Sequence, residues 1–225
     1  MVKPLFMNPS VPVGPAVFVR ATGCLALLIS SGVIADDATK LTRRLYVANR
    51  SSVSIYDIDN GHRFLREFET PGGDYKGICA DAARGRLYLT SRHDEQLICV
   101  DLLSERPVWT LQIGGYPDSC ALTPDGRTMY VPRRDAGDWR VIDAVQRQIV
   151  ATIQIPGKPH NTWCSLDGKW MYLSALDNPL LYVVDARTHQ FVREVGPFLT
   201  TRGRGIRPFC ISDDDRRAYL NVDDL

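Results

Sequence analysis

Five tyrosines recur along the chain at a nearly constant interval, and this spacing constrains the fold more than any other feature. Each lies in a short apolar run, and the intervals are 42, 42, 42 and 47 residues between Tyr46, Tyr88, Tyr130, Tyr172 and Tyr219. A series of aspartates has nearly the same spacing, with intervals of 44, 42 and 42 residues between Asp57, Asp101, Asp143 and Asp185. Repetition at roughly 40–50 residues in a β-rich sequence is typical of a propeller or a solenoid.

One repeat shows the order of elements most clearly. Residues 119–122 form an apolar run, and the Thr-Pro-Asp-Gly sequence at 123–126 is typical of a tight turn. Three more strands are predicted over 127–132, 139–144 and 148–155, because apolar residues alternate there. Four strands per repeat indicate an all-β fold, a β-propeller built from four-stranded antiparallel blades.

The repeated aspartates are interpreted as turn residues. Each is followed seven residues later by an apolar residue, at Phe64, Val108, Val150 and Val192, which indicates a hairpin of fixed length. An aspartate in such a turn accepts backbone N–H groups. A series of metal ligands is the alternative, but every blade needs the same turn.

The repeat resembles the YVTN-type β-propeller family over about residues 43–225. The residues that carry the resemblance are Gly115-Tyr116-Pro117, Pro124-Asp125-Gly126, Met129-Tyr130-Val131, Val141-Ile142-Asp143 and Ile149-Val150-Ala151-Thr152-Ile153. The resemblance implies a seven-bladed, often exported propeller. The family includes binding proteins, proteins of unknown role and relatives of sugar lactonases, and it supplies no universal catalytic motif. The last blade departs from the pattern, since Asp213-Asp214-Asp215 replaces Pro-Asp-Gly.

The repeats predict about four and a half blades, a fragment of a seven-bladed ring with an open edge. The predicted blades cover about residues 43–70, 75–114, 117–155, 159–197 and 206–225. The first is expected to lack its innermost strand, and the last to contain only its two inner strands. Residues 36–42 are expected to form a short linker.

The first 35 residues have the composition of an export signal. Lys3 and Arg20 supply positive charge, residues 21–35 are uncharged and mostly apolar, and Val33 and Ala35 suit a cleavage site. We expect a periplasmic or secreted protein without a membrane span after signal removal, because the apolar run is short. An uncleaved leader, a misassigned start codon and lipidation at Cys24 are the alternatives.

Charge and cysteine content exclude two classes of partner. The chain has 27 basic and 26 acidic residues, and removal of Lys3 and Arg20 with the signal leaves a net charge of −1. This gives no reason to expect nucleic-acid binding. There is no C-x-x-C-H sequence and hence no covalent c-type haem site. Four cysteines are expected to pack in inner strands that are usually too far apart for disulfides: Cys79, Cys120, Cys164 and Cys210. Disulfide pairing in an oxidising compartment is the alternative.

Loops between the fourth and first strands, and between the second and third, are expected to emerge on one arginine-rich face around the channel mouth. The longest interval between tyrosines contains an insertion on this face, with Arg202, Arg204 and Arg207 near glycines. Guanidinium groups bind carboxylate and phosphate, so these residues are candidates for an anion-binding loop. A solvated mobile loop is the alternative.

A second set of candidates lies at the starts of the inner strands. His160 and Asn161 are placed at the channel mouth beside equivalent residues of neighbouring blades, Tyr116, Asp118, Asp74 and Tyr75, with His93 further out. His160 is a candidate metal ligand or general base, with Asp118 or Asp74 as the acid. An ordinary loop hydrogen bond is the alternative. His62 and His189 are expected on the opposite face, exposed to solvent.

These features favour an exported binding protein that holds a small anionic molecule or a protein partner at its arginine-rich face. No catalytic motif is present, neither G-x-S-x-G nor H-E-x-x-H nor a P-loop. A lactonase- or lyase-like enzyme with a divalent cation is one alternative, and a scaffold in an extracellular assembly is another. The sequence identifies no cofactor.

Overall fold

The structure is a computed structural model that describes residues 18–21, 24–31, 42–198 and 205–222. The described residues form β-strands joined by turns and loops, as the sequence predicts. The part of the chain that the structure describes contains no helix with the length and apolar character of a membrane span.

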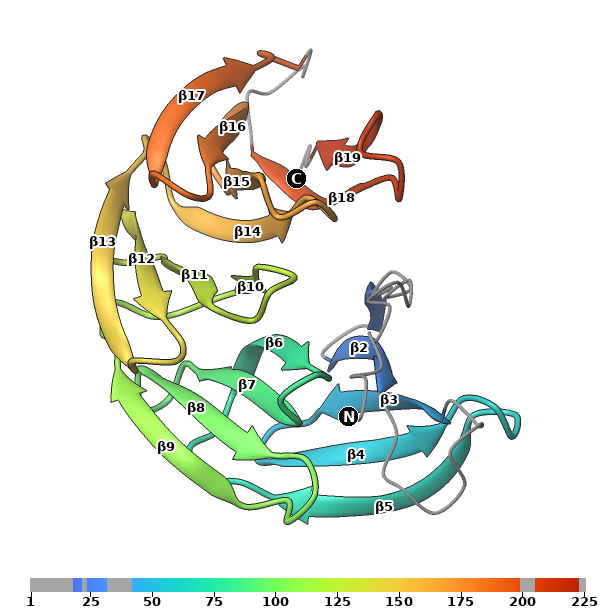
Figure 1. The fold of residues 1–225 in the computed structure, drawn as a ribbon. Coiled ribbons are helices and arrows are strands. Elements are labelled where there is room, and N and C mark those ends of the chain that lie inside the picture. Colours follow the sequence, from blue (N-terminus) through green and yellow to red (C-terminus); the bar gives the residue numbers. More distant parts are fainter. Residues whose placement is uncertain (1–17, 22–23, 32–41, 199–204, 223–225) are drawn as a thin grey trace, which may run out of the picture.

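The strands form five antiparallel sheets that follow one another around an open arc (Figure 1). The first sheet contains β1 (Phe18–Ala21), β2 (Cys24–Ser31), β3 (Thr42–Ala48), β4 (Ser52–Asp57) and β5 (Arg63–Glu69). The second contains β6 (Tyr75–Asp81), β7 (Arg86–Ser91), β8 (Gln96–Asp101) and β9 (Pro107–Gln112). The third contains β10 (Ala121–Leu122), β11 (Thr128–Arg133), β12 (Asp138–Asp143) and β13 (Gln148–Gln154).

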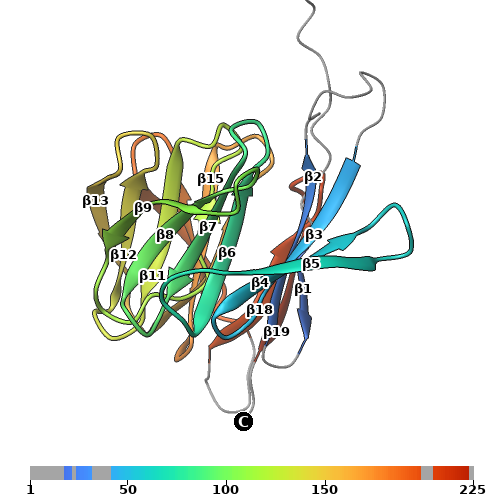
Figure 2. The same ribbon diagram turned by 90° about the horizontal axis from the view of Figure 1, so that it is seen from below.

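The fourth sheet contains β14 (Pro159–Cys164), β15 (Trp170–Ala175), β16 (Asn178–Asp185) and β17 (Gln190–Val195). The fifth pairs β18 (Ile206–Ile211) with β19 (Ala218–Val222). We call these sheets blades 1 to 5. Blades 2, 3 and 4 confirm the predicted four-stranded antiparallel blades. Strands β6, β10, β14 and β18 are the innermost of blades 2 to 5 (Figure 1). The strands run between two faces, where the loops gather (Figure 2).

The expectation that blade 1 lacks an inner strand is wrong. Strand β2 pairs with β3 in antiparallel register from Leu25 opposite Ala48 to Ser31 opposite Thr42, so it holds the position that β6 holds in blade 2, and β1 pairs on its other edge. An apolar run of eight residues suits a buried strand as well as the core of a signal, which is why the pattern misled. Cleavage after Ala35 would remove β1 and β2, so export remains a prediction.

The tyrosine series marks the interfaces between blades. Tyr46, Tyr88 and Tyr130 are 4%, 3% and 0% exposed, and each lies in an apolar cluster shared by its own blade and the next. Tyr172 packs in the same way against the cluster around Ile206. Tyr219, the last of the series, is 55% exposed, because no described blade packs on it.

Both kinds of predicted turn are confirmed. Asp101, Asp143 and Asp185 each accept two backbone N–H groups at 2.7–3.1 Å. In the Pro-Asp-Gly turn, Asp125 accepts the Arg127 N–H at 3.0 Å. The divergent turn of blade 5 keeps this geometry, since Asp214 accepts the Arg216 N–H at 3.0 Å and Asp215 takes the glycine position with φ +55°.

Two expectations about single residues need correction. His62 is exposed as expected, but His189 is half-buried, and its Nδ1 shares a hydrogen bond of 2.7 Å with the Tyr130 hydroxyl. Cys79 and Cys120 come from neighbouring inner segments, yet their sulfurs lie 3.3 Å apart, so these segments are not too distant for a contact.

We predict that Tyr130→Ala lowers the free energy of unfolding by about 3–5 kcal/mol, because a fully buried ring is lost from a blade interface. Tyr219→Ala is the matched control at an exposed position of the same series, with an expected effect within about 0.5 kcal/mol. Urea unfolding followed by circular dichroism measures both. Equal losses would show that the series does not mark the interfaces.

We also predict a pH-dependent stability that arises at His189. Burial lowers the pKa of His189 from its ordinary value of 6.5, although Asp185 opposes this. The unfolded chain therefore binds the proton more tightly, and the contribution to stability that is present above pH 6.5 is lost as the pH falls below it. His189→Asn, which tolerates the left-handed backbone of φ +60°, should flatten the dependence between about pH 7.5 and 5.5. His62→Asn should leave it unchanged.

Candidate functional site

Three arginines from equivalent loops lie on the predicted arginine-rich face. Arg50 follows β3, Arg92 follows β7 and Arg134 follows β11. The three arginines are spaced 42 residues apart. The loops that carry them lie beside the segments that enter the inner strands: the Arg92 N–H donates to the Asp74 carbonyl, and the Arg134 N–H donates to the Tyr116 carbonyl. The expectation that both kinds of loop emerge together is confirmed.

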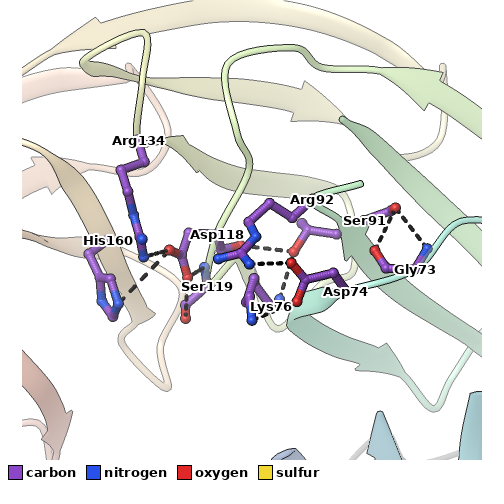
Figure 3. A network of polar contacts seen from close by, with 11 residues as sticks. Gly73, Asp74, Lys76, Ser91, Arg92, Asp118, Ser119, Arg134 and His160 are labelled. Carbon is purple, nitrogen blue, oxygen red and sulfur yellow. Dashed lines mark hydrogen bonds and ion pairs between the residues drawn. The ribbon is translucent and has the colours of Figure 1, made fainter. Parts of the chain in front are cut away.

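In blade 2, Asp74 joins two cations. Its carboxylate forms ion pairs with Lys76 Nζ at 2.8 Å and with the Arg92 guanidinium (Figure 3). Burial favours a raised pKa for Asp74, but the contacts with Lys76 and Arg92 outweigh it, so the pKa lies below its ordinary value. Asp74 has φ +50°, a left-handed conformation that aspartate tolerates better than most residues.

In blade 3, Asp118 occupies the centre of a second network. Its side chain is only 4% exposed, pairs with Arg134, and accepts the Ser119 N–H at 2.9 Å. His160 approaches the same carboxylate, with 3.9 Å between His160 Nε2 and Asp118 Oδ2 (Figure 3). Lys76, Asp118 and His160 are 42 residues apart, so they occupy equivalent positions at the starts of three inner strands.

Tyr116 connects the two networks. The Arg92 guanidinium lies 4.4 Å from the centre of its ring, and the Arg134 guanidinium lies 5.6 Å from it, which are cation–π distances. Tyr116 has φ +61°, and Gly114 and Gly115 before it are also left-handed. The Glu95 carboxylate accepts the Tyr116 N–H at 3.1 Å. A strained backbone held by an anchoring hydrogen bond fixes the ring between two arginines.

A pocket of about 590 Å³ opens beside these groups. Its lining residues come from three blades: Arg50, Ser51, Gly73, Asp74, Arg92, His93 and Tyr116. Arg92 and Arg134 each have a carboxylate partner. The guanidinium of Arg50 has no ion pair with any residue that the structure describes. The lining therefore contains two guanidinium groups and one carboxylate, which favours an anion.

The structure brings together part of the predicted set. Asp74, Tyr116 and His93 line the pocket, and Asp118 and His160 lie in the adjoining network. Tyr75 does not line the pocket: its ring is 6% exposed in a core cluster, and its hydroxyl donates to the Pro71 carbonyl at 2.8 Å.

Four other predicted residues lie apart from the pocket lining or cannot be placed. Asn161 is 9% exposed in β14, and Arg207 lies half-buried within β18 rather than in a loop. Arg202 and Arg204 fall outside the described residues, so the anion-binding loop remains a prediction.

The predicted cation site is incomplete in the described part of the chain. No group of three or more His, Cys, Asp or Glu side chains there is arranged to hold a metal ion. Of the two acids proposed beside His160, only Asp118 approaches it, and Asp74 lies with Lys76 and Arg92 (Figure 3). Asp118 already pairs with a guanidinium, which would compete with a bound cation.

Sequence reasoning placed Arg50 on the arginine-rich face without naming it as a site residue, and it missed Gly73 and Glu95. The 42-residue spacing of Arg50 with Arg92 and Arg134 is a signal that could have identified Arg50. The role of Glu95 has no such signal, because it depends on the path of the loop that carries Tyr116.

We predict that Gly115→Ala destabilises the fold and displaces Tyr116. A Cβ at Gly115 would lie 2.8 Å from Ala136 Cβ, in addition to the strain of φ +65°. Gly137→Ala is the matched control in the same blade, because φ is +73° there and a Cβ would meet nothing within 4 Å. Both should lose about 1–2 kcal/mol to backbone strain, and Gly115→Ala should lose more. Equal melting temperatures for the two variants would contradict this.

No protein-family model matches the chain, and no curated protein matches it in sequence. Solved structures do share its fold. Hydrazine synthase from Kuenenia stuttgartiensis is similar with a TM-score of 0.67 and 18% identity over 79% of this chain. The β-propeller domain of Cps50 (Swd1) from Myceliophteria thermophila is similar with a TM-score of 0.66 and 13% identity over 80% of it. The chain spans 51% and 59% of those two proteins. These similarities establish a β-propeller fold.

Proposed function

We propose that this protein is an exported binding protein of the YVTN-type propeller family, and that it holds a small carboxylate- or phosphate-containing ligand in the pocket between Arg50 and Arg92. The repeat pattern supports the family, and the uncharged run at residues 21–35 supports export. The site does not depend on the first 35 residues, since the pocket lining begins at Arg50.

The observation that carries the proposal is that the Arg50 guanidinium lines the pocket and has no ion pair with a described residue. Its equivalents Arg92 and Arg134 are neutralised by Asp74 and Asp118. Arg50 lines the pocket without an ion pair among the described residues, so its donors are available to a ligand. A guanidinium presents its N–H groups in a planar fork that matches a carboxylate or phosphate, and such charge-assisted bonds are the strong ones.

The rest of the lining supplies rigidity and further donors. Arg92 is held by Asp74 and by the face of Tyr116, so it enters the pocket in a fixed orientation. Ser51 and His93 add polar side chains at the rim, where His93 is 77% exposed. A preorganised site loses less side-chain entropy on binding than a flexible one. A small anion that reaches Arg50 and Arg92 together fits this arrangement best.

We predict that Arg50→Ala weakens the binding of a small anion about 10- to 100-fold, since it removes charge-assisted hydrogen bonds worth about 1.5–3 kcal/mol. The probes are inorganic phosphate, succinate and citrate, each titrated by calorimetry at low ionic strength. Arg106→Ala is the control, because Arg106 is an exposed arginine on a turn of the opposite face. Binding that is equal in Arg50→Ala and the parent protein, or the absence of binding for all three probes, would refute the proposal.

A further inference from the structure

The side chains of Cys79 and Cys120 meet across the interface between blades 2 and 3. Their Sγ atoms lie 3.3 Å apart, and the Cys79 thiol also lies 3.2 Å from the Cys120 carbonyl oxygen. Both residues are 4% exposed, and both belong to the apolar cluster that joins the two blades. Cys79 lies in the innermost strand of blade 2, and Cys120 immediately precedes that of blade 3.

A close approach of the two backbones explains this contact. A Cβ added at Gly77 would lie 2.7 Å from the Asp118 carbonyl oxygen and 2.7 Å from the Cys120 nitrogen, so only glycine fits there. Thr90 bridges the same two segments: its hydroxyl accepts the Gly77 N–H at 2.6 Å and donates to the Asp118 carbonyl at 2.9 Å. The two inner segments are therefore held together where the cysteines lie.

We propose that Cys79 and Cys120 form a disulfide that joins blades 2 and 3 covalently when the chain folds in an oxidising environment. A disulfide needs sulfurs about 2.05 Å apart, so the observed separation requires an approach of little more than about 1 Å. Rotation about the Cα–Cβ bonds of Cys79 and Cys120 supplies such a shift. The bond would close a loop from residue 79 to residue 120 that contains Asp118.

The chemistry is thiol–disulfide exchange with an external disulfide, such as oxidised glutathione or a protein oxidant. The thiolate of one cysteine attacks that disulfide, forms a mixed disulfide and releases one thiolate, which takes up a proton. The second cysteine then attacks the mixed disulfide, forms the Cys79–Cys120 bond and releases the second thiol. The protein loses two electrons and two protons, and the external disulfide gains both.

Burial of the two sulfurs determines when the disulfide forms. In the folded chain both sulfurs are enclosed, and the contact with Cys120 together with burial raises the pKa of Cys79, so few thiolates are available to an external reagent. The exchange therefore takes place during folding, before the cluster between blades 2 and 3 closes. After folding, the same enclosure protects the bond from reductants.

The test is to refold the full chain in a buffer of reduced and oxidised glutathione and to map its disulfides by mass spectrometry without reduction. We expect a linked pair of peptides that contain Cys79 and Cys120, and two fewer free thiols than in the reduced chain. Reduction under unfolding conditions, followed by refolding with a reductant, should lower the melting temperature by roughly 5–10 °C, because a closed loop of this length stabilises through the unfolded state.

Variants separate this pair from the other cysteines. Cys79→Ser and Cys120→Ser should each abolish the linked peptide and the reductant-dependent shift, whereas Cys210→Ser, at an exposed cysteine, should retain both. The peptide map of the parent chain decides the matter even if a buried serine prevents folding. Unmodified Cys79 and Cys120 in the oxidised refolded protein, or linkage of either to another cysteine, would overturn the proposal.

Discussion

The packing of each blade against the next is the constraint on which the rest of the structure depends. Each interface buries one tyrosine of the repeat among apolar residues from two blades, as with Tyr88 among residues of blades 2 and 3. The hydrogen bond at the Tyr130 hydroxyl joins residues that are still farther apart in the sequence. The Tyr130 hydroxyl shares a hydrogen bond with His189, 59 residues later. A single blade could not bury these rings without the next blade packed against it. The stability of a blade therefore depends largely on its contacts with neighbouring blades.

The site is a product of this repetition and of the places where it fails. Equivalent positions on the arginine-rich face hold Asp74, Tyr116 and Lys158 in three successive blades, and Lys76, Asp118 and His160 in the same blades. Because the scaffold repeats and these side chains do not, cations and carboxylates of neighbouring blades meet in different combinations. Arg92 and Arg134 pair with carboxylates, whereas Arg50 has no ion pair with a described residue, so one guanidinium in the pocket that Tyr116 also lines keeps its charge uncompensated there.

The structural features that depend on local periodicity could be predicted from the sequence. The blades, their strands, the Asp turns and the shared face of the loops all follow from a pattern that repeats every 42 residues. The sequence could not predict contacts that depend on how one backbone approaches another. Strand β2 has the same apolar composition as the core of an export signal. The orientation of Tyr75 depends on its hydroxyl reaching Pro71, and the contact of Cys79 with Cys120 depends on the missing side chain of Gly77.

The close approach of inner segments at Gly77 involves the stretch of chain that carries Asp118, the most buried carboxylate of the site. Asp118 holds Arg134 through its side chain, while its carbonyl oxygen accepts the Thr90 hydroxyl that also bridges to Gly77. Cys120 follows two residues later, against Cys79. The position of the Asp118 carboxylate, and with it the orientation of Arg134 over Tyr116, is therefore set by the interface between blades 2 and 3. A covalent bond at that interface would affect the geometry of the site as well as the stability of the packing between blades 2 and 3.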